Sequence, residues 1–156
     1  MYFEEQIEQI KNEFSSSEFK IPFNNATQIL KTIESHFIRQ KDINKSRNNI
    51  AQNCNDWACN IKEKERIEIV QLQSIDDFLD RFEHKTNYWL VIAWCNNPQI
   101  KHQIYDTELS ALKAIVSIHQ NDFFIIDKKY NWFYFFEVDK ENNIVSVYKS
   151  INNKKS

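Results

Sequence analysis

Apolar residues near the start of the chain recur with the spacing of an α-helix. Residues at i, i+4, i+7 and i+11 place one apolar stripe along a first helix of about three turns, which the serines at 15–17 should end. The stripe consists of Phe3, Ile7, Ile10 and Phe14. A second helix is predicted to begin after Asn25, with Gln28 as its capping-box partner, and to fade near Gln40. Its buried face would consist of Ile29, Leu30, Ile33 and Phe37.

The polar, asparagine-rich stretch that follows keeps a helical spacing only at three residues: Ile50, Cys54 and Trp57. A short helix and an irregular loop are both compatible with this pattern. The segment 65–73 has the β-branched content of a strand, but its apolar phase slips between Ile69 and Val70. Either a β-bulge or a strand covered on both faces would explain the slip.

Two further helices and an inner strand are predicted from the middle of the chain. Ser74 should cap a helix, with Asp77 in the capping-box position. Its inward face would consist of Ile75, Phe78, Leu79 and Phe82. The segment 88–94 is apolar in both alternation phases, which predicts a strand inside the sheet. Asp106 should cap the next helix, which should end near Asn121. The buried side of that helix would consist of Leu109, Leu112, Ile115 and Val116.

The stretch 122–149 has the pattern of three antiparallel strands joined by short turns, and its middle strand is the most aromatic part of the chain. The rings alternate between Trp132, Tyr134 and Phe136 on one face and Phe133 and Phe135 on the other. Apolar residues in both phases predict a strand buried on both sides, so core packing is the favoured role of these rings. Lys128 and Lys129 are predicted to lie in the first turn.

These elements predict an α+β fold in which N-terminal helices pack on a mostly antiparallel sheet of about five strands that ends in a β-meander. The first strand–helix–strand connection could add one parallel pair. We expect residues 1–156 to form a single domain, with a helical N-terminal part over about 1–60 and a mixed sheet part over about 61–150.

The chain has 156 residues and no glycine, whereas average usage would give roughly eleven. Walker A loops, Rossmann fingerprints and nucleophile elbows all need glycine for close backbone approach or positive φ, so these nucleotide and hydrolase motifs are excluded. Left-handed positions should fall to Asn or Asp. Asparagine pairs predict turns at 24–25, 96–97 and 142–143.

The charge and the cysteine content limit which classes of partner and which cellular compartment we expect. Lys plus Arg total 20 against 22 for Asp plus Glu, and a net charge of −2 argues against the broad basic field of a phosphate-backbone binder. Three cysteines and a start without the features of a secretion signal predict the cytoplasm. The apolar run from Tyr88 to Cys95 is far shorter than the roughly 20 residues of a membrane helix, so we expect no membrane partner.

Groups suited to catalysis or metal binding are scattered along the chain. The histidines show no ligand spacing: His36, His84, His102 and His119. Cys54 and Cys59 lack a second pair downstream, and Cys95 stands alone. No nucleophile, base and orienting group can be assigned together. We therefore expect no metal, no cofactor and no enzymatic activity.

Acidic residues concentrate on and before the helix that follows Ser74. The candidates for partner binding are Asp76, Asp77, Asp80 and Glu83 on the outer side of this helix and Glu68 on the preceding strand. A solvated helix face is the ordinary interpretation of such a charge run. The sharper interpretation is a docking surface whose carboxylates complement the basic cleft of a nuclease.

The segments YDTELSALKAIV and DFFIIDKKYNWFYFFEVD, at 105–116 and 122–139, resemble the C-terminal half of small bacterial proteins associated with polymorphic toxins. The shared form is an acid-capped helix, a strand ending in Asp-Lys-Lys and a strand opening with Trp. The low-glycine, Asn-rich and Lys-rich character is similar to immunity proteins of contact-dependent growth inhibition systems. Some of those proteins carry histidines where this chain has Phe136, Glu137 and Val138. The resemblance implies a cytoplasmic, non-catalytic inhibitor that binds and blocks one cognate toxin domain.

A small nucleic-acid-binding domain is the alternative function. The aromatic strand at 131–138 follows Lys128 and Lys129, and interleaved aromatic and basic residues are typical of sheets that stack RNA bases. The glycines that let bases lie flat on such a sheet are missing here. Nucleic acid is therefore the less favoured partner.

Overall fold

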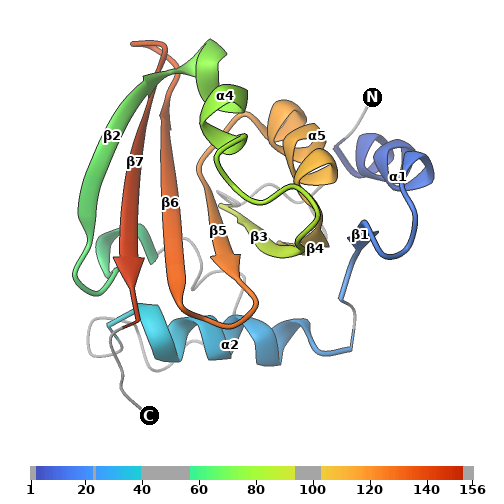
Figure 1. Ribbon diagram of the computed structural model, residues 1–156, viewed down its shortest axis with the longest axis horizontal. Helices are drawn as coiled ribbons and strands as arrows, with labels where there is room; N and C mark the ends of the chain where they lie inside the picture. The colour runs from blue at the N-terminus through green and yellow to red at the C-terminus, as the bar shows by residue number, and fades with distance from the viewer. Residues whose placement is uncertain (1–2, 23, 40–56, 94–102, 153–156) are drawn as a thin grey trace.

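The computed structural model describes residues 3–22, 24–39, 57–93 and 103–152. They form an α+β fold, as predicted, in which helices pack on a seven-stranded open sheet (Figure 1). The strand order is β1-β4-β3-β5-β6-β7-β2, and every strand pair in this part of the chain is antiparallel. The sheet thus has two more strands than the approximately five expected, and the possible parallel pair is not formed.

The helices are α1 (Phe3–Glu13), α2 (Ala26–Phe37), α4 (Ile75–Leu79) and α5 (Leu109–His119), with short 3₁₀ helices η2 (Trp57–Cys59) and η3 (Leu72–Ser74). Helices α1, α2 and α5 begin and end close to the predicted positions, whereas α4 begins as predicted but ends before Phe82 and Glu83, which were expected on it. Asn25 and Ser74 occupy the expected N-cap positions of α2 and α4, but neither side chain makes a capping hydrogen bond. The capping-box predictions for Gln28 and Asp77 are therefore wrong.

The strands are β1 (Phe19–Lys20), β2 (Glu65–Gln71), β3 (Tyr88–Ile92), β4 (Ile104–Thr107), β5 (Phe123–Asp127), β6 (Trp132–Asp139) and β7 (Ile144–Ile151). The predicted meander is present as β5, β6 and β7. Lys128 and Lys129 lie in its first turn, as expected, and the pair 142–143 lies in its second. The pair 96–97 lies outside the described residues.

Asp106 does not cap α5, because it belongs to β4. Glu108 is the N-cap residue of that helix. In β4, Asp106 is almost fully buried and accepts hydrogen bonds from Asn87 at 2.8 Å and from Lys128 at 2.6 Å. A buried carboxylate is tolerated where donors satisfy it, so a polar residue that suggests a helix start instead occupies a strand.

Strand β2 forms one edge of the sheet and is mostly exposed, so the expectation of a doubly covered strand is wrong. Its pairing with β7 shifts register between Arg66 and Glu68, which supports the alternative of a bulge a few residues before the predicted slip. Ile69 is 49% exposed. The apolar phase slip thus reflects an irregular edge strand rather than burial.

Two hydrophobic cores lie on opposite faces of the sheet. Helices α1, α4 and α5 cover one face, while α2 and η2 cover the other (Figure 1). The rings of β6 alternate between them as predicted: Phe136 packs into the first core, and Phe133 and Phe135 pack into the second. Trp132 and Tyr134 contact the first core but remain half-buried. Part of the aromatic face is therefore open to solvent.

The segment around Trp57 joins the second core. Trp57 is fully buried in η2, and its indole N–H donates a 2.9 Å hydrogen bond to Glu34 on α2. Ile50 and Cys54 lie outside the described residues, and so does most of the possible helix there.

Four described residues have positive φ: Glu63, Gln120, Tyr130 and Asn143. Only Asn143 fits the expectation that Asn or Asp would fill such positions. Gln120 takes the left-handed conformation directly after α5 and ends that helix.

Candidate binding face around helix α4

The four acids predicted on the outer side of the helix after Ser74 do not share one helix face, whereas Glu68 lies on the preceding strand as expected. Helix α4 has only five residues, and Asp76 and Asp77 are exposed in its first turn. Asp80 directly follows the helix, Glu83 lies in the loop to β3, and Glu68 lies on β2. These acids come from three elements, so each depends on its own neighbours.

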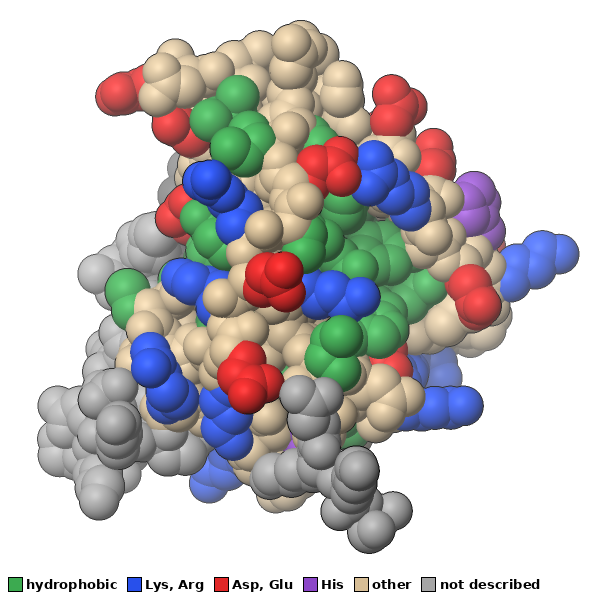
Figure 2. All heavy atoms as spheres, turned by 60° about the vertical axis from the view of Figure 1, so that its left-hand side comes forward, with side chains coloured by type: hydrophobic (Ala, Val, Ile, Leu, Met, Phe, Trp, Pro, Cys, Tyr) green, Lys and Arg blue, Asp and Glu red, His purple; other side chains and the backbone are tan. Residues whose placement is uncertain are grey.

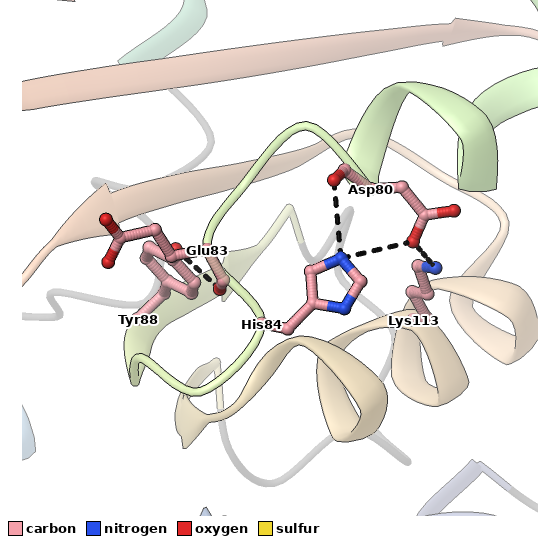
Figure 3. Close-up of polar contacts among 5 residues, drawn as sticks. All are labelled: Asp80, Glu83, His84, Tyr88 and Lys113. Carbon is pink, nitrogen blue, oxygen red and sulfur yellow. Dashed lines mark hydrogen bonds and ion pairs between the residues drawn. The ribbon is translucent and has the colours of Figure 1, made fainter.

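Asp80 is held by groups that are distant in the sequence. Lys113 on α5 donates a hydrogen bond to its carboxylate, and His84 Nε2 lies 3.8 Å from Asp80 Oδ1 and 3.3 Å from the Asp80 carbonyl oxygen (Figure 3). The hydrogen bond from Lys113 lowers the pKa of Asp80, and the positive charges of Lys113 and His84 act in the same direction. The negative charge of Asp80 is therefore balanced by the cation of Lys113 in the same chain.

Glu68 is matched in the same way. Arg81 donates two hydrogen bonds to its carboxylate, at 2.8 and 3.0 Å, and these lower the pKa of Glu68. The guanidinium carbon of Arg81 lies 4.5 Å from the centroid of the Phe78 ring. This bidentate pair fixes the end of α4 against the edge strand, so Glu68 is already bound.

Glu83 accepts hydrogen bonds that hold the loop between α4 and β3 in place. Its side chain accepts a 2.9 Å hydrogen bond from the Thr86 hydroxyl. Its backbone carbonyl accepts a 2.9 Å hydrogen bond from the Tyr88 hydroxyl, which Figure 3 shows. Of the five predicted acids, Asp76 and Asp77 alone have no side-chain hydrogen bond or ion pair to another described residue.

An open cleft of about 480 Å³ lies beside these residues, between the loop that follows α4, the β5–β6 turn and the end of β7. We call it the aromatic cleft. Its lining includes the rings of Phe82, Tyr88, Trp132 and Tyr134 and the charged residues Arg81, Glu83, Asp127, Lys128, Lys129 and Lys149. Sequence reasoning identified the aromatic strand together with Lys128 and Lys129, but it did not show that they meet the loop after α4.

The rings of the aromatic cleft hold one another in place. Phe82 stacks on Trp132 with centroids 5.4 Å apart and an interplanar angle of 19°, and Tyr134 meets Trp132 edge-on at 5.2 Å. Tyr88 contacts Trp132 at 5.8 Å. Because these contacts join the loop to the sheet, the cleft has a rigid aromatic wall before any partner binds.

Some charged side chains of the aromatic cleft have hydrogen-bond or ion-pair partners within the chain, and others form no ion pair with a described residue. Asp127 accepts backbone N–H bonds from Asn131 and Trp132 at 2.6 and 3.1 Å, which fixes the β5–β6 turn. Lys128 donates a hydrogen bond to the Asp106 carboxylate, and its Nζ lies 4.5 Å from the centroid of the Trp89 ring. Lys129 and Lys149 form no ion pair with any described residue.

The surface around this site mixes charge with exposed apolar groups. Figure 2 brings the side of β2 and β7 forward and shows apolar side chains gathered near the middle of that face, with basic and acidic side chains around them. The face is neither a broad acidic field nor a broad basic one. Such a mixture suits a protein partner better than a uniform polyanion.

Among the described residues, no group of three His, Cys, Asp or Glu side chains is placed to hold a metal ion. Cys59 is exposed, while Cys54, Cys95 and His102 lie outside the described residues. In the same part of the chain, no helix is both long and apolar enough to cross a membrane.

Comparison of the chain with protein-family models, with curated proteins and with solved structures found no match.

Proposed function

We propose that the protein is a non-catalytic inhibitor that binds a cognate toxin domain and blocks its active site. The aromatic cleft carries this proposal, because it joins half-buried Trp132 and Tyr134 to Arg81 on one rigid surface. Trp, Tyr and Arg are the residues that most often dominate the binding energy of protein interfaces. The resemblance to immunity proteins supports a toxin as the partner.

The acidic residues keep a smaller role in this proposal. Asp76 and Asp77 can steer a basic partner, whereas Asp80 and Glu68 are held by Lys113 and Arg81. A nuclease remains one candidate for the toxin, because its basic cleft would complement the two free carboxylates. We expect these charges to affect the association rate more than the lifetime of the complex.

The test is co-expression with the product of the neighbouring upstream gene. We predict a one-to-one complex in which the toxin is inactive. The double variant Asp76→Lys/Asp77→Lys should slow association by about tenfold or less at low salt, since steering by exposed charges is screened by ions. The matched control is Glu5→Lys/Glu8→Lys, which makes the same change in net charge at two exposed positions of α1. A gene product that neither copurifies nor loses activity would contradict the proposed function.

Nucleic-acid binding is the second candidate, because Trp132 and Tyr134 are only half-buried and Lys149 lies beside them. It predicts copurifying nucleic acid with a raised ratio of absorbance at 260 to 280 nm, and binding that weakens steeply with salt. Clean protein without salt-sensitive binding would remove this candidate.

A further inference from the structure

We infer that β2 pairs with β2 of a second copy of this chain, so that two sheets join edge to edge in an antiparallel arrangement around Ile69. Such a dimer goes beyond the proposed function and does not depend on it, since no residue of β2 lines the aromatic cleft. The contact would be made by residues 67–71 of each copy, which we call the edge segment.

Strand β2 is the longer of the two edges of the sheet. It is the last strand in the sheet order, and its neighbour in the described part of the chain is β7 (Figure 1). In an antiparallel pair, the backbone groups of alternate residues point away from the neighbouring strand. The outer N–H and C=O groups of β2 can therefore bond to a further strand. The opposite edge, β1, has two residues and offers a much shorter template.

The edge segment lacks the unpaired charges that usually keep sheet edges apart. Ile67 and Ile69 are 42% and 49% exposed, and together with Ile151 they are the exposed large apolar residues of the described chain. Glu68 is the one charged residue of the segment, and it forms an ion pair with Arg81. Because the segment is apolar and its single charge is balanced, pairing with a second strand would remove its isoleucines from water without leaving a carboxylate unpaired.

A symmetric register about Ile69 suits the edge segment best. The opposed pairs would be Ile69 with Ile69, Glu68 with Val70, and Ile67 with Gln71. No like charges face each other in this register. A register about Glu68 would oppose two carboxylates, which is destabilising in a sheet. A register about Val70 would leave Ile67 without a partner residue on β2.

The edge segment supplies its own complement, and this favours a second copy over a foreign strand. Its centre is apolar, both of its ends are uncharged, and its ion-paired acid meets an apolar residue. A twofold axis then repeats the same contacts on both sides, as in most homodimers. The register shift between Arg66 and Glu68 limits regular pairing to the residues after it, so the interface is short. We therefore expect reversible dimers with a Kd of roughly 10–500 µM.

Sedimentation equilibrium of the full-length protein tests the dimer. From about 10 µM to about 1 mM, the average mass should rise from that of a monomer toward that of a dimer. Ile69→Lys should weaken association by about tenfold or more, because two cations would meet at the axis. The matched control is Ile151→Lys, which makes the same substitution at an isoleucine that is 52% exposed on β7. A wild type that stays monomeric throughout, or equal association of the two variants, would overturn the inference.

Disulfide cross-linking tests the register, with the wild type giving the background from its native cysteines. In Ile69→Cys the two introduced residues would be directly opposed, with Cβ atoms about 4.5–5.5 Å apart, close to the roughly 3.5–4.5 Å of a disulfide. Mild oxidation should therefore link two copies through these thiols, which mass spectrometry of the linked peptide identifies. The control Ile151→Cys should stay at the background level. Circular dichroism should show that all variants fold, and equal cross-linking of both cysteine variants would contradict the edge-to-edge arrangement.

A strand of the toxin is the other candidate occupant of this edge. If the wild type stays monomeric while Ile69→Lys loses toxin binding and Ile151→Lys retains it, β2 receives a strand of the toxin and the homodimer inference fails. If the dimer forms in the register about Ile69 but no toxin binds, the proposed function fails and the dimer stands.

Discussion

At the scale of single residues, ion pairs within the chain decide which of the predicted acids keep an unpaired charge. Glu68 and Arg81 are 13 residues apart in the sequence, and Asp80 and Lys113 are 33 apart. Periodicity places each carboxylate on an outer surface, but it does not show which cation from another element will reach it. Sequence reasoning therefore grouped all five acids, whereas the structure pairs Asp80 and Glu68 with cations of the same chain.

His119 should make stability depend on pH. It is buried at the end of α5, packs edge-on against Phe3, and donates from Nε2 to the Asp122 carbonyl oxygen at 3.1 Å. Burial lowers its pKa, and the charge of Lys140 acts in the same direction. The unfolded state, with a histidine pKa of about 6.5, therefore binds the proton more readily, so stability should fall as the pH drops through that value.

The opposite shift at Asp122 acts against this effect, so the contribution of His119 is measured by comparing the wild type with a His119 variant. Burial raises the pKa of the Asp122 carboxyl, so its stabilising contribution is present at acidic pH and is lost as the pH rises through the folded-state pKa. Urea unfolding at about pH 7.5 and about pH 5.5 should show lower stability at the acidic pH, with a smaller loss in His119→Gln. An equal loss in wild type and variant would assign the pH dependence to other groups.

At the scale of elements, the long periodic segments were predictable and the short or irregular ones were not. Helices α1, α2 and α5 and strands β3, β5, β6 and β7 follow their apolar patterns. Strand β1 has two residues and β4 has four, too few for alternation to show, and β4 contains Asp106 in the place of a helix cap. The length of α4 depends on where the chain must turn toward β3, which no local pattern shows.

Strand β6 should be the most sensitive element of the core. Phe136 is fully buried and stacks on Phe123 with centroids 4.5 Å apart and an interplanar angle of 7°. We expect Phe136→Ala to lower the free energy of unfolding by about 3–5 kcal/mol, through lost burial and an unfilled cavity. The control Ile69→Ala, on the exposed edge strand, should cost about 0.5 kcal/mol or less. Urea unfolding measures both, and similar losses would contradict the assigned core.

At the scale of the whole molecule, helices cover both faces of the sheet. A surface of aromatic and charged side chains lies beside the loop after α4, next to β6 and β7. The aromatic cleft forms there because the loop after α4 returns across the sheet and places Phe82 and Tyr88 against Trp132. Phe82 and Tyr88 are 50 and 44 positions from Trp132 in the sequence. Strand order, rather than any motif, brings them together, so the cleft could not be predicted from the sequence.

Hydrogen exchange with mass spectrometry on the toxin complex tests the central claim most directly, because it reports which backbone amides a partner protects. The account predicts slower exchange over 80–88 and 127–134 in the complex, with exchange in α2 unchanged. Protection confined to α2 or to other surfaces away from the aromatic cleft would contradict the claim that this cleft binds the toxin.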